Sequence, residues 1–264
     1  MKPTSSFDTR GYWERRLAIH PDSRGTGHHR LPLECNEALY GLARERLESA
    51  LKRHDIDLKD TRILDVGSGF GYFVGCYEEW GASRLVGIDL THASAKHLSE
   101  AYPGYSFVQA DASFLPFPLS VQFDLVLALN VFYHIVDEER FLAALSGACR
   151  RVRPGGYLVV SDSFRPLRIP AARHVRLRGL SNYGPALEEA GLRPRGFSPL
   201  YFLNIFLPFV PLGQYFLSKR KAISLLLRIE DHLRNKHPSG LGILNLMVAE
   251  RLLGGESQAG AGWQ

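Results

Sequence analysis

The chain has 264 residues, of which 45% are hydrophobic and 22% charged, as expected for one globular domain with an elaboration or two. Its net charge of +5 is unevenly spread: residues 150–178 hold eight arginines and a single acid, so this segment carries +7 and the rest of the chain about −2. Such local basicity indicates a site or a face and argues against a general nucleic-acid-binding surface.

The N-terminal part shows no secretory signal and predicts helices. Met1–His20 mixes acids, bases and aromatics and lacks the apolar core and cleavage site of an exported protein, so we expect a cytoplasmic location. Asp8–Leu17 predicts a short helix, and Leu33–His54 has apolar residues at the spacing of a longer one. We expect residues 1–58 to form a helical cover over the site.

Five short apolar or β-branched runs follow, each separated from the next by enough residues for a helix. They are Arg62–Val66, Leu85–Asp89, Tyr105–Asp111, Phe123–Asn130 and Tyr157–Asp162. This alternation predicts a parallel α/β sheet, and ligands bind such sheets in the crevice outside the carboxyl ends of the strands. Polar residues at or near those ends should converge on one edge: Asp65, Asp89, Asp111, Asn130 and Asp162.

Further elements are predicted behind the fifth strand. Tyr183–Ala190 predicts a helix that ends at Gly191, a favourable residue just past a helix end. A strand, a helix and a last strand follow near Arg195–Phe202, Gln214–Asn235 and Leu241–Leu252. We expect one domain with a doubly wound, seven-stranded, mostly parallel sheet, whose cover, core, substrate side and loose tail occupy residues 1–58, 59–164, 165–253 and 254–264.

An uncharged run lies among these late elements. Pro199–Leu217 has no charge over nineteen residues and precedes Lys219, Arg220 and Lys221. Three prolines within it argue against a continuous membrane-spanning helix. We expect a strand followed by an apolar lid insertion, while a membrane-surface contact and a homodimer interface stay open as alternatives.

The three cysteines are isolated in the sequence. Cys35, Cys76 and Cys149 form no CxxC pair and have no histidine at metal-ligand spacing beside them. We therefore expect buried thiols that act as small hydrophobes, and neither a disulfide framework nor a metal site.

A glycine-rich loop follows the first predicted strand. In the run DVGSGFGY, residues 65–72, glycines at alternate positions let the backbone turn tightly and let a ligand lie against it. Asp89 ends the next strand 22 residues after Gly67, where a carboxylate can bind a ribose diol. Tyr72 occupies the place of the third glycine in the dinucleotide fingerprint GxGxxG, and no phosphate-binding GKS or GKT follows. The loop predicts an adenosine-containing cofactor other than a dinucleotide.

Five blocks in order carry a resemblance to a known family. They are ILDVGSGFGYF, GIDLT, QADASFLPF, FDLVLALNVFYHI and RVRPGGYLVV, at residues 63–73, 87–91, 109–117, 123–135 and 151–160. In this series the chain resembles the class I S-adenosylmethionine-dependent methyltransferases, and in particular those that act on small molecules. The resemblance implies a Rossmann-like methyltransferase fold, S-adenosylmethionine as cofactor and S-adenosylhomocysteine as product.

The resemblance also implies cofactor-binding roles residue by residue. Asp65 and the carbonyl of Asn130 would bind the methionine ammonium. Asp89 would hold the ribose hydroxyls, Leu90 would pack on adenine, and Asp111 would face the adenine amino edge. For each residue the alternative is a strand-end cap or a turn. The implied set is Asp65, Gly67, Ser68, Gly69, Gly71, Tyr72, Asp89, Leu90, Asp111, Ala112 and Asn130.

Catalysis of methyl transfer requires chiefly that the nucleophile be aligned with the sulfur–carbon bond for in-line displacement. A hydroxyl or carbon acid also needs a base, and histidine has the proton equilibrium that suits neutral pH. His134, four residues beyond Asn130, is the leading candidate, and Tyr133 and His174 are further ones. A purely structural role of His134 in ordering its loop stays open.

The helical cover and the residues that follow the fifth strand indicate the chemical class of the acceptor. Nucleic acid bases and glutamine side chains are poor candidates, because residues 130–133 lack the Asn/Asp-Pro-Pro-Tyr/Phe motif of the methyltransferases that act on them. Arginines beside an apolar lid suggest a small or lipid-like, anionic acceptor, although these arginines could equally form a solvated face. The expected acceptor-binding residues are Tyr12, Trp13, His28, Tyr40, Arg176 and Tyr201.

Two other functions stay open at this stage. A protein of this fold can keep the cofactor and catalyse a non-methylating reaction such as a cyclisation. It can also lose the cofactor and act as a binding protein, which the intact glycine loop and Asp89 make the least favoured reading.

Overall fold

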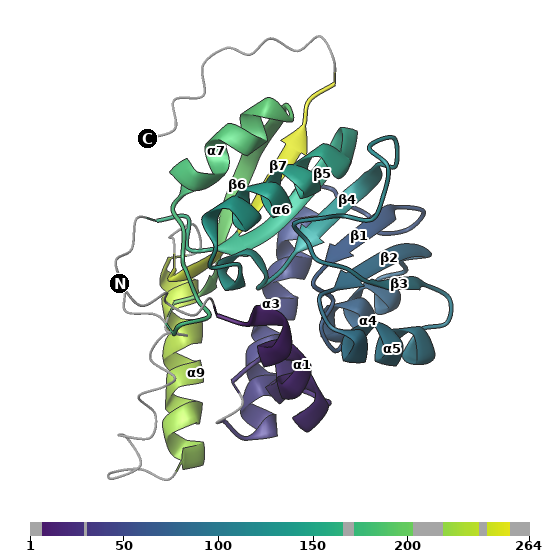
Figure 1. The fold of residues 1–264 in the computed structure, drawn as a ribbon. Helices are drawn as coiled ribbons and strands as arrows, with labels where there is room; N and C mark the ends of the chain where they lie inside the picture. Colours follow the sequence, from purple (N-terminus) through teal and green to yellow (C-terminus); the bar gives the residue numbers. More distant parts are fainter. Residues whose placement is uncertain (1–6, 29–30, 166–171, 203–218, 238–241, 254–264) are drawn as a thin grey trace, which may run out of the picture.

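The computed structural model describes residues 7–28, 31–165, 172–202, 219–237 and 242–253 (Figure 1). A seven-stranded sheet of order β3-β2-β1-β4-β5-β7-β6 forms its centre, and β7 runs antiparallel to both of its neighbours. The strands are β1 Arg62–Val66, β2 Arg84–Asp89, β3 Ser106–Gln109, β4 Phe123–Ala128, β5 Val152–Asp162, β6 Leu192–Tyr201 and β7 Leu244–Arg251. The predicted doubly wound, mostly parallel sheet is confirmed.

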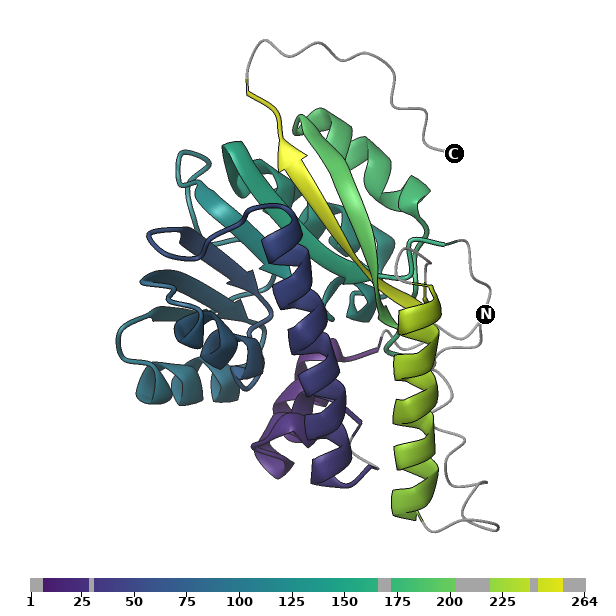
Figure 2. The same ribbon diagram turned by 180° about the vertical axis from the view of Figure 1, so that it is seen from behind.

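Helices cover both faces of the sheet. α6 and α7 lie on the face turned to the viewer in Figure 1, and α3 crosses the opposite face in Figure 2. α1 lies beyond the carboxyl ends of the parallel strands, beside α3. The described helices are α1 Thr9–Ile19, α2 Ser23–Thr26, α3 Leu33–Arg53, α4 Tyr72–Glu79, α5 His92–Ala101, the 3-10 helix η1 Phe132–His134, α6 Glu138–Arg151, α7 Leu180–Glu189 and α9 Lys219–Lys236.

The central strands are apolar on both sides because both faces are covered. Ile63 and Leu125 belong to the buried cluster that includes α3, whereas Leu64 and Val126 belong to the cluster that includes α6 and α7. This alternation follows the two-residue period of a strand. The two clusters hold the strands in register and thereby fix where the loops at the carboxyl edge begin.

Polar side chains cap the N-termini of two helices that start near the carboxyl edge of the sheet. Thr91 accepts a hydrogen bond from the Ser94 N–H at the start of α5, and Asp137 accepts one from the Arg140 N–H at the start of α6. Both caps satisfy backbone donors that lack a partner within their helix. They also place the first turns of α5 and α6 beside the ends of β2 and β4.

Most element boundaries agree with the sequence predictions to within a few residues. β5 begins five residues earlier than predicted, because Val152 already pairs with Phe123 of β4. The sequence did not reveal α2 or η1, which are too short to show a periodic pattern. The predicted lid lies mostly in residues 203–218, and the predicted tail in residues 254–264, both outside the described residues.

The cysteines are free and buried, as predicted. Within the described ranges, no group of histidine, cysteine and acidic side chains could hold a metal ion. None of the helices in those ranges combines the length and the apolarity that a membrane crossing requires.

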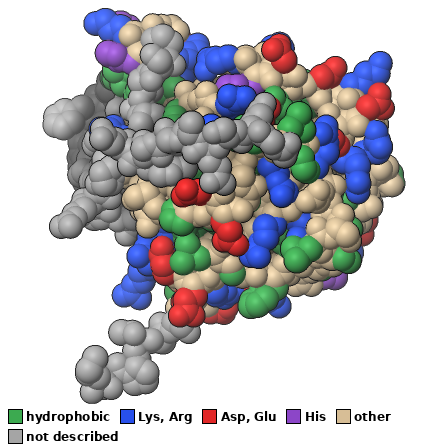
Figure 3. All heavy atoms as spheres, turned by 90° about the horizontal axis from the view of Figure 1, so that it is seen from above, with side chains coloured by type: hydrophobic (Ala, Val, Ile, Leu, Met, Phe, Trp, Pro, Cys, Tyr) green, Lys and Arg blue, Asp and Glu red, His purple; other side chains and the backbone are tan. Residues whose placement is uncertain are grey.

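The arginines of residues 150–178 are largely engaged with the protein itself. Arg153 pairs with Asp124, and both Arg176 and Arg178 pair with Glu138. On the face seen from above, basic and acidic side chains are interspersed (Figure 3). The local excess of positive charge in the sequence is therefore partly neutralised by acids that come from other segments.

Removal of a central core side chain should test this packing. Leu64 is fully buried in β1, and we expect Leu64→Ala to lower the free energy of unfolding by about 2–5 kcal/mol, because a cavity remains. Leu119, which is 64% exposed, provides the control, since Leu119→Ala should change stability by no more than about 0.5 kcal/mol. Urea denaturation measures both, and equal losses would contradict the assigned core.

Candidate functional site

A cavity of about 520 Å³ opens at the carboxyl edge of the sheet, within the range of small-molecule sites. The segments that leave β1, β2, β3 and β4 form one wall at residues 67–70, 88–90, 110–112 and 129–131. Side chains from α1, α2 and α3 form another wall. The strand ends and the N-terminal cover thus enclose one space.

The glycine loop after β1 needs its glycines for two physical reasons. Gly67 and Gly69 have φ angles of +78° and +55°, in the left-handed region that favours glycine. A Cβ on Gly67 would lie 2.4 Å from Cγ2 of Val131, and one on Gly69 would lie 2.7 Å from Cγ2 of Thr26. The loop therefore presents bare backbone to the cavity, and Thr26 of the cover packs directly against it.

Asp89 is fixed at the end of β2 by three donors. Its carboxylate accepts hydrogen bonds from the N–H of Gly69 at 2.9 Å and from the N–H and hydroxyl of Thr91 at 2.9 and 2.8 Å. Burial raises the pKa of this carboxyl above its ordinary value, and these hydrogen bonds oppose that shift. A carboxylate has about four acceptor positions, so one remains for a ligand hydroxyl.

Asp111 and Asn130 also line the cavity, and both have protein partners. Asp111 accepts a hydrogen bond from the Ser113 N–H at 2.9 Å and forms an ion pair with Arg140 of α6. Asn130 has φ +59°, its backbone N–H donates to the hydroxyl of Ser161 at 2.6 Å, and that hydroxyl donates to the side-chain Oδ1 of Asn130 at 3.2 Å. Both side chains are thus held in place before any ligand binds.

Two strand-end acids of the predicted set do not line the cavity. Asp162 faces α7, where its carboxylate accepts a hydrogen bond from the Tyr183 hydroxyl at 2.7 Å. Asp65 lies beneath the glycine loop and is only 4% exposed, and burial raises its pKa to about 6. Gly71, another predicted residue, caps α4 outside the lining. The remaining predicted cofactor residues line the cavity: Gly67, Ser68, Gly69, Tyr72, Asp89, Leu90, Asp111, Ala112 and Asn130.

His134 lines the cavity from η1, and one contact determines which of its ring nitrogens carries the hydrogen. Its Nδ1 lies 3.0 Å from the carbonyl oxygen of His174. A carbonyl oxygen only accepts hydrogen bonds, so Nδ1 carries the hydrogen and Nε2 is left with its lone pair. Burial lowers the pKa of this imidazole to about 3, so it is neutral at physiological pH.

Aromatic rings from the cover surround this histidine. Trp13 lines the cavity, and its ring lies edge-on to His134 with the ring centroids 4.9 Å apart. His174 stacks on His134 at 5.4 Å and on Tyr12 at 4.8 Å, although neither His174 nor Tyr12 lines the cavity. Tyr40 lines the cavity from α3.

The other predicted acceptor and catalytic residues lie outside the lining. The hydroxyl of Tyr201 donates to the carbonyl of Leu39 at 2.9 Å within the core. Tyr133 is buried beside His134, and burial raises the pKa of its hydroxyl well above the ordinary value. His28 is bonded through its backbone N–H to the buried Asn36, and Arg176 pairs with Glu138. The cavity therefore brings together only part of the predicted acceptor set.

The sequence did not indicate several lining residues. Arg140 was missed because its partner Asp111 lies on a different loop, and no spacing connects the two. Thr26 was missed because α2 has only four residues. The apolar residues Ile135 and Val136 follow the motif that contains His134 and carry no chemical signal of their own.

Comparison with known proteins shows which family the central part of the chain resembles. Residues 64–160 match the family model described as a methyltransferase domain. Over these residues the chain is similar to the class I S-adenosylmethionine-dependent methyltransferases. The cofactor of this family is S-adenosylmethionine.

The individual relatives are distant in sequence. A protein of Mycolicibacterium smegmatis named "Probable S-adenosylmethionine-dependent methyltransferase" is 28% identical over 61% of this chain and 65% of its own length. The phthiotriol/phenolphthiotriol dimycocerosates methyltransferase 1 of Mycobacterium ulcerans is 34% identical over 40% of this chain and 39% of its own length. Other relatives are named tRNA U34 carboxymethyltransferase, from Pseudomonas fluorescens, and ubiquinone biosynthesis O-methyltransferase, from Rhizobium etli. The matches span only about half of the length of these curated relatives.

Solved structures show the same fold. The magnesium protoporphyrin IX methyltransferase of Synechocystis PCC 6803 with bound S-adenosylmethionine superposes with a TM-score of 0.58 at 12% identity, covering 94% of this chain and 99% of that chain. At this identity the likeness concerns the fold alone.

The residues of the cavity fit this cofactor. Gly67 and Gly69 line the cavity without a side chain of their own, so a ligand can approach the backbone of the loop. The Asp89 carboxylate has an acceptor position for a sugar hydroxyl. The buried Asp65 lies beneath the same loop and provides negative potential for a cationic group.

The raised pKa of Asp65 predicts a pH dependence of stability. A carboxyl with a folded-state pKa of about 6 binds its proton more tightly in the folded state, so stability falls as pH rises from about 4 to 6. As the pH rises from 4 to 7, we expect the free energy of unfolding of Asp65→Asn to increase by about 2–3 kcal/mol relative to that of the natural protein. The exposed Asp60→Asn is the control. Urea denaturation at several pH values measures the difference, and a constant difference would contradict the assignment.

Proposed function

We propose that this protein transfers a methyl group from S-adenosylmethionine to a hydroxyl of a small or lipid-like acceptor with an apolar or aromatic body. One observation carries the proposal: a neutral histidine with a free Nε2 shares a cavity with the glycine loop and Asp89. The part of the cavity beside the glycine loop and Asp89 suits the cofactor. The part beside His134 suits an acceptor that must lose a proton.

Residues of the strand-end wall would hold the cofactor. Asp89 would accept a hydrogen bond from a ribose hydroxyl at its remaining acceptor position, and Asp111 would accept one from the adenine amino group. The backbone of residues 67–69 would line the methionine part, with the carbonyl of Asn130 and the charge of Asp65 near its ammonium. When bound, S-adenosylmethionine supplies a methyl group that its sulfonium has already activated.

His134 would take the proton that the acceptor loses. A hydroxyl oxygen becomes strongly acidic as it gains a methyl group, so even an imidazole with a pKa of about 3 can accept its proton. The Nδ1 contact with His174 holds the ring in the tautomer that this task requires. Trp13 and Tyr40 would exclude water from the reacting atoms.

The acceptor class follows from the remaining lining residues. Trp13, Tyr40, Leu129 and Ile135 offer apolar and aromatic contacts. Arg140, the cation among the described lining residues, is paired with Asp111. This composition favours an apolar body over an anionic group, and the lipid named in the M. ulcerans relative agrees with it. An RNA acceptor, as named in other relatives, is the competing possibility.

Calorimetric titration with S-adenosylmethionine, S-adenosylhomocysteine and NADH tests the cofactor. Micromolar binding of the first two and no binding of NADH is expected, and the absence of binding would overturn the proposal. Release of S-adenosylhomocysteine with phenols, hydroxylated lipids and transfer RNA then tests the acceptor. Product formed only with RNA would exclude the proposed acceptor class, and turnover without S-adenosylhomocysteine would indicate non-methylating chemistry.

Asp89→Ala should weaken binding of S-adenosylmethionine at least about tenfold, because a charge-assisted hydrogen bond to the ribose is lost. Asp89→Asn should lose less, since its amide oxygen still accepts a hydrogen bond. Calorimetry measures both affinities, with the exposed Asp60→Asn as the matched control. Unchanged affinity in Asp89→Ala would show that the ribose lies elsewhere.

His134→Ala should lower kcat by about 100-fold, within the usual range for loss of a general base, and should change cofactor affinity by less than about threefold. Since the pKa of His134 is about 3, this group should cause no loss of kcat between pH 8 and pH 5. Steady-state rates over this pH range measure both effects. Full activity in the alanine variant would assign His134 to structure alone.

A further inference from the structure

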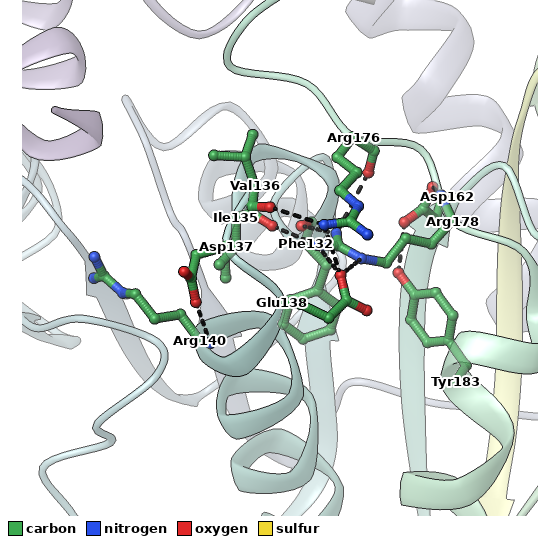
Figure 4. Close-up of polar contacts among 10 residues, drawn as sticks. All are labelled: Phe132, Ile135, Val136, Asp137, Glu138, Arg140, Asp162, Arg176, Arg178 and Tyr183. Carbon is green, nitrogen blue, oxygen red and sulfur yellow. Dashed lines mark hydrogen bonds and ion pairs between the residues drawn. The ribbon is translucent and has the colours of Figure 1, made fainter. Parts of the chain in front are cut away.

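The segment that carries His134 is held by a second segment, distant in sequence. Residues 132–138, here called the η1 loop, leave the end of β4 and lead into α6. Residues 174–178, here called the brace, run along this loop (Figure 4). Four backbone carbonyls of the η1 loop accept hydrogen bonds from the brace: those of Phe132, Tyr133, Ile135 and Val136.

Arg178 makes the largest share of these contacts. Its guanidinium donates to the carbonyl of Phe132 at 3.2 Å and to that of Ile135 at 2.7 Å. The same group pairs with Glu138, the last residue of the η1 loop, at 3.2 Å. One side chain thus binds the beginning, the middle and the end of the loop.

Arg178 is itself fixed by the core. It is 3% exposed, and its guanidinium lies 3.7 Å from the ring centroid of Phe141 in α6. Its backbone N–H donates to the carboxylate of Asp162 at 3.0 Å, and the Tyr183 hydroxyl donates to that same carboxylate at 2.7 Å. The brace therefore connects the η1 loop to the rigid end of β5 and to α7.

The η1 loop needs such a partner because a single 3-10 turn satisfies few of its own carbonyls. Within the loop, the Ile135 N–H donates to Phe132. The carbonyls of Ile135 and Val136 receive donors from Arg178 and Arg176 instead. A guanidinium has five donors in a planar fork and can serve several carbonyls at once, which an ammonium cannot do with the same geometry.

The brace also reaches His134 directly. The carbonyl of His174 accepts the hydrogen on Nδ1 of His134 at 3.0 Å, and the Arg176 N–H donates to the carbonyl of Tyr133 at 2.7 Å. The first contact holds the ring of His134, and the second holds the peptide bond that links Tyr133 to His134. Displacement of the brace would therefore remove the acceptor that selects the tautomer of His134.

We propose that Arg178 is a positioning residue: it holds the η1 loop against the brace so that His134 keeps its Nδ1–H tautomer and presents an unprotonated Nε2 to the acceptor. This inference rests on the proposed role of His134 in methyl transfer. It gives the arginines at the end of the basic segment a task within the protein, in place of the predicted binding of an anionic acceptor.

The test uses the full chain labelled with ¹⁵N-histidine. In the natural protein, the ring nitrogen shifts of His134, assigned by comparison with His134→Gln, should show the Nδ1–H tautomer at pH 7. In Arg178→Met they should move toward the Nε2–H tautomer or toward an average of the two. The same variant should lose about tenfold to a hundredfold in kcat, with S-adenosylmethionine affinity within about twofold, because the reacting groups are misaligned.

Other variants separate positioning from folding. Arg178→Lys keeps the positive charge but loses the planar guanidinium with its five donors. It should give a tautomer shift and a loss of kcat between those of the natural protein and those of Arg178→Met. If Arg178→Met does not fold, Arg176→Ala removes the half-exposed guanidinium from Val136 and Glu138 and should shift the tautomer in the same direction by less. Arg173→Met, which changes an exposed arginine just before the brace, should leave the tautomer and kcat unchanged.

The two readouts distinguish the possible failures. An unchanged His134 tautomer in folded Arg178→Met and Arg178→Lys would overturn the positioning role, whatever happens to kcat. A tautomer change in these variants, in a protein that shows no methyl transfer at all, would support the positioning role while the proposed function fails.

Discussion

The candidate site depends above all on the parallel pairing of β1 with β4. Asp65 lies opposite Leu127 in this register, so the chain leaves both strands at nearly the same level. The two loops then meet, and Gly67 passes so close to Val131 that no side chain fits between them. A slip of one residue would turn Leu64 away from the α6 layer, so the buried clusters on both faces fix the register. Core packing therefore sets the spacing between the glycine loop and the segment that carries His134.

Much of this arrangement could be predicted from the sequence, because hydrophobic periodicity encodes which strands are central and where they end. The convergence of Asp89, Asp111 and Asn130 on one cavity follows from that topology alone. The direction of Asp162 depends on which face of β5 packs against α6 and α7. Val160, two residues earlier, belongs to that cluster, and a strand repeats its facing every two residues. The strand-end rule alone predicts Asp162 at the ligand edge, and this prediction is wrong because the side chain faces α7.

The arginines show what a sequence pattern leaves undecided. Eight of them in residues 150–178 indicate an anion site, yet a guanidinium binds a backbone carbonyl and a carboxylate of its own protein by the same donors. The outcome depends on whether nearby carbonyls lack partners, and that is a property of the tertiary structure. Burial of Arg178 costs solvation, as the lowering of its pKa by burial indicates. Glu138, the loop carbonyls and the ring of Phe141 offset that cost.

The electrostatics of His134 bear on which acceptor atom suits the cavity. An imidazole whose pKa burial lowers to about 3 resists becoming a cation, so it takes a proton only from a group that is more acidic still. A methylated amine is a weak acid and would keep its proton in front of such a histidine. A methylated hydroxyl is a far stronger acid and would give its proton up. The ring of Trp13 packs edge-on to this imidazole and contributes to the burial that lowers its pKa. The proposed preference for oxygen over nitrogen as the atom that receives the methyl group rests on this burial.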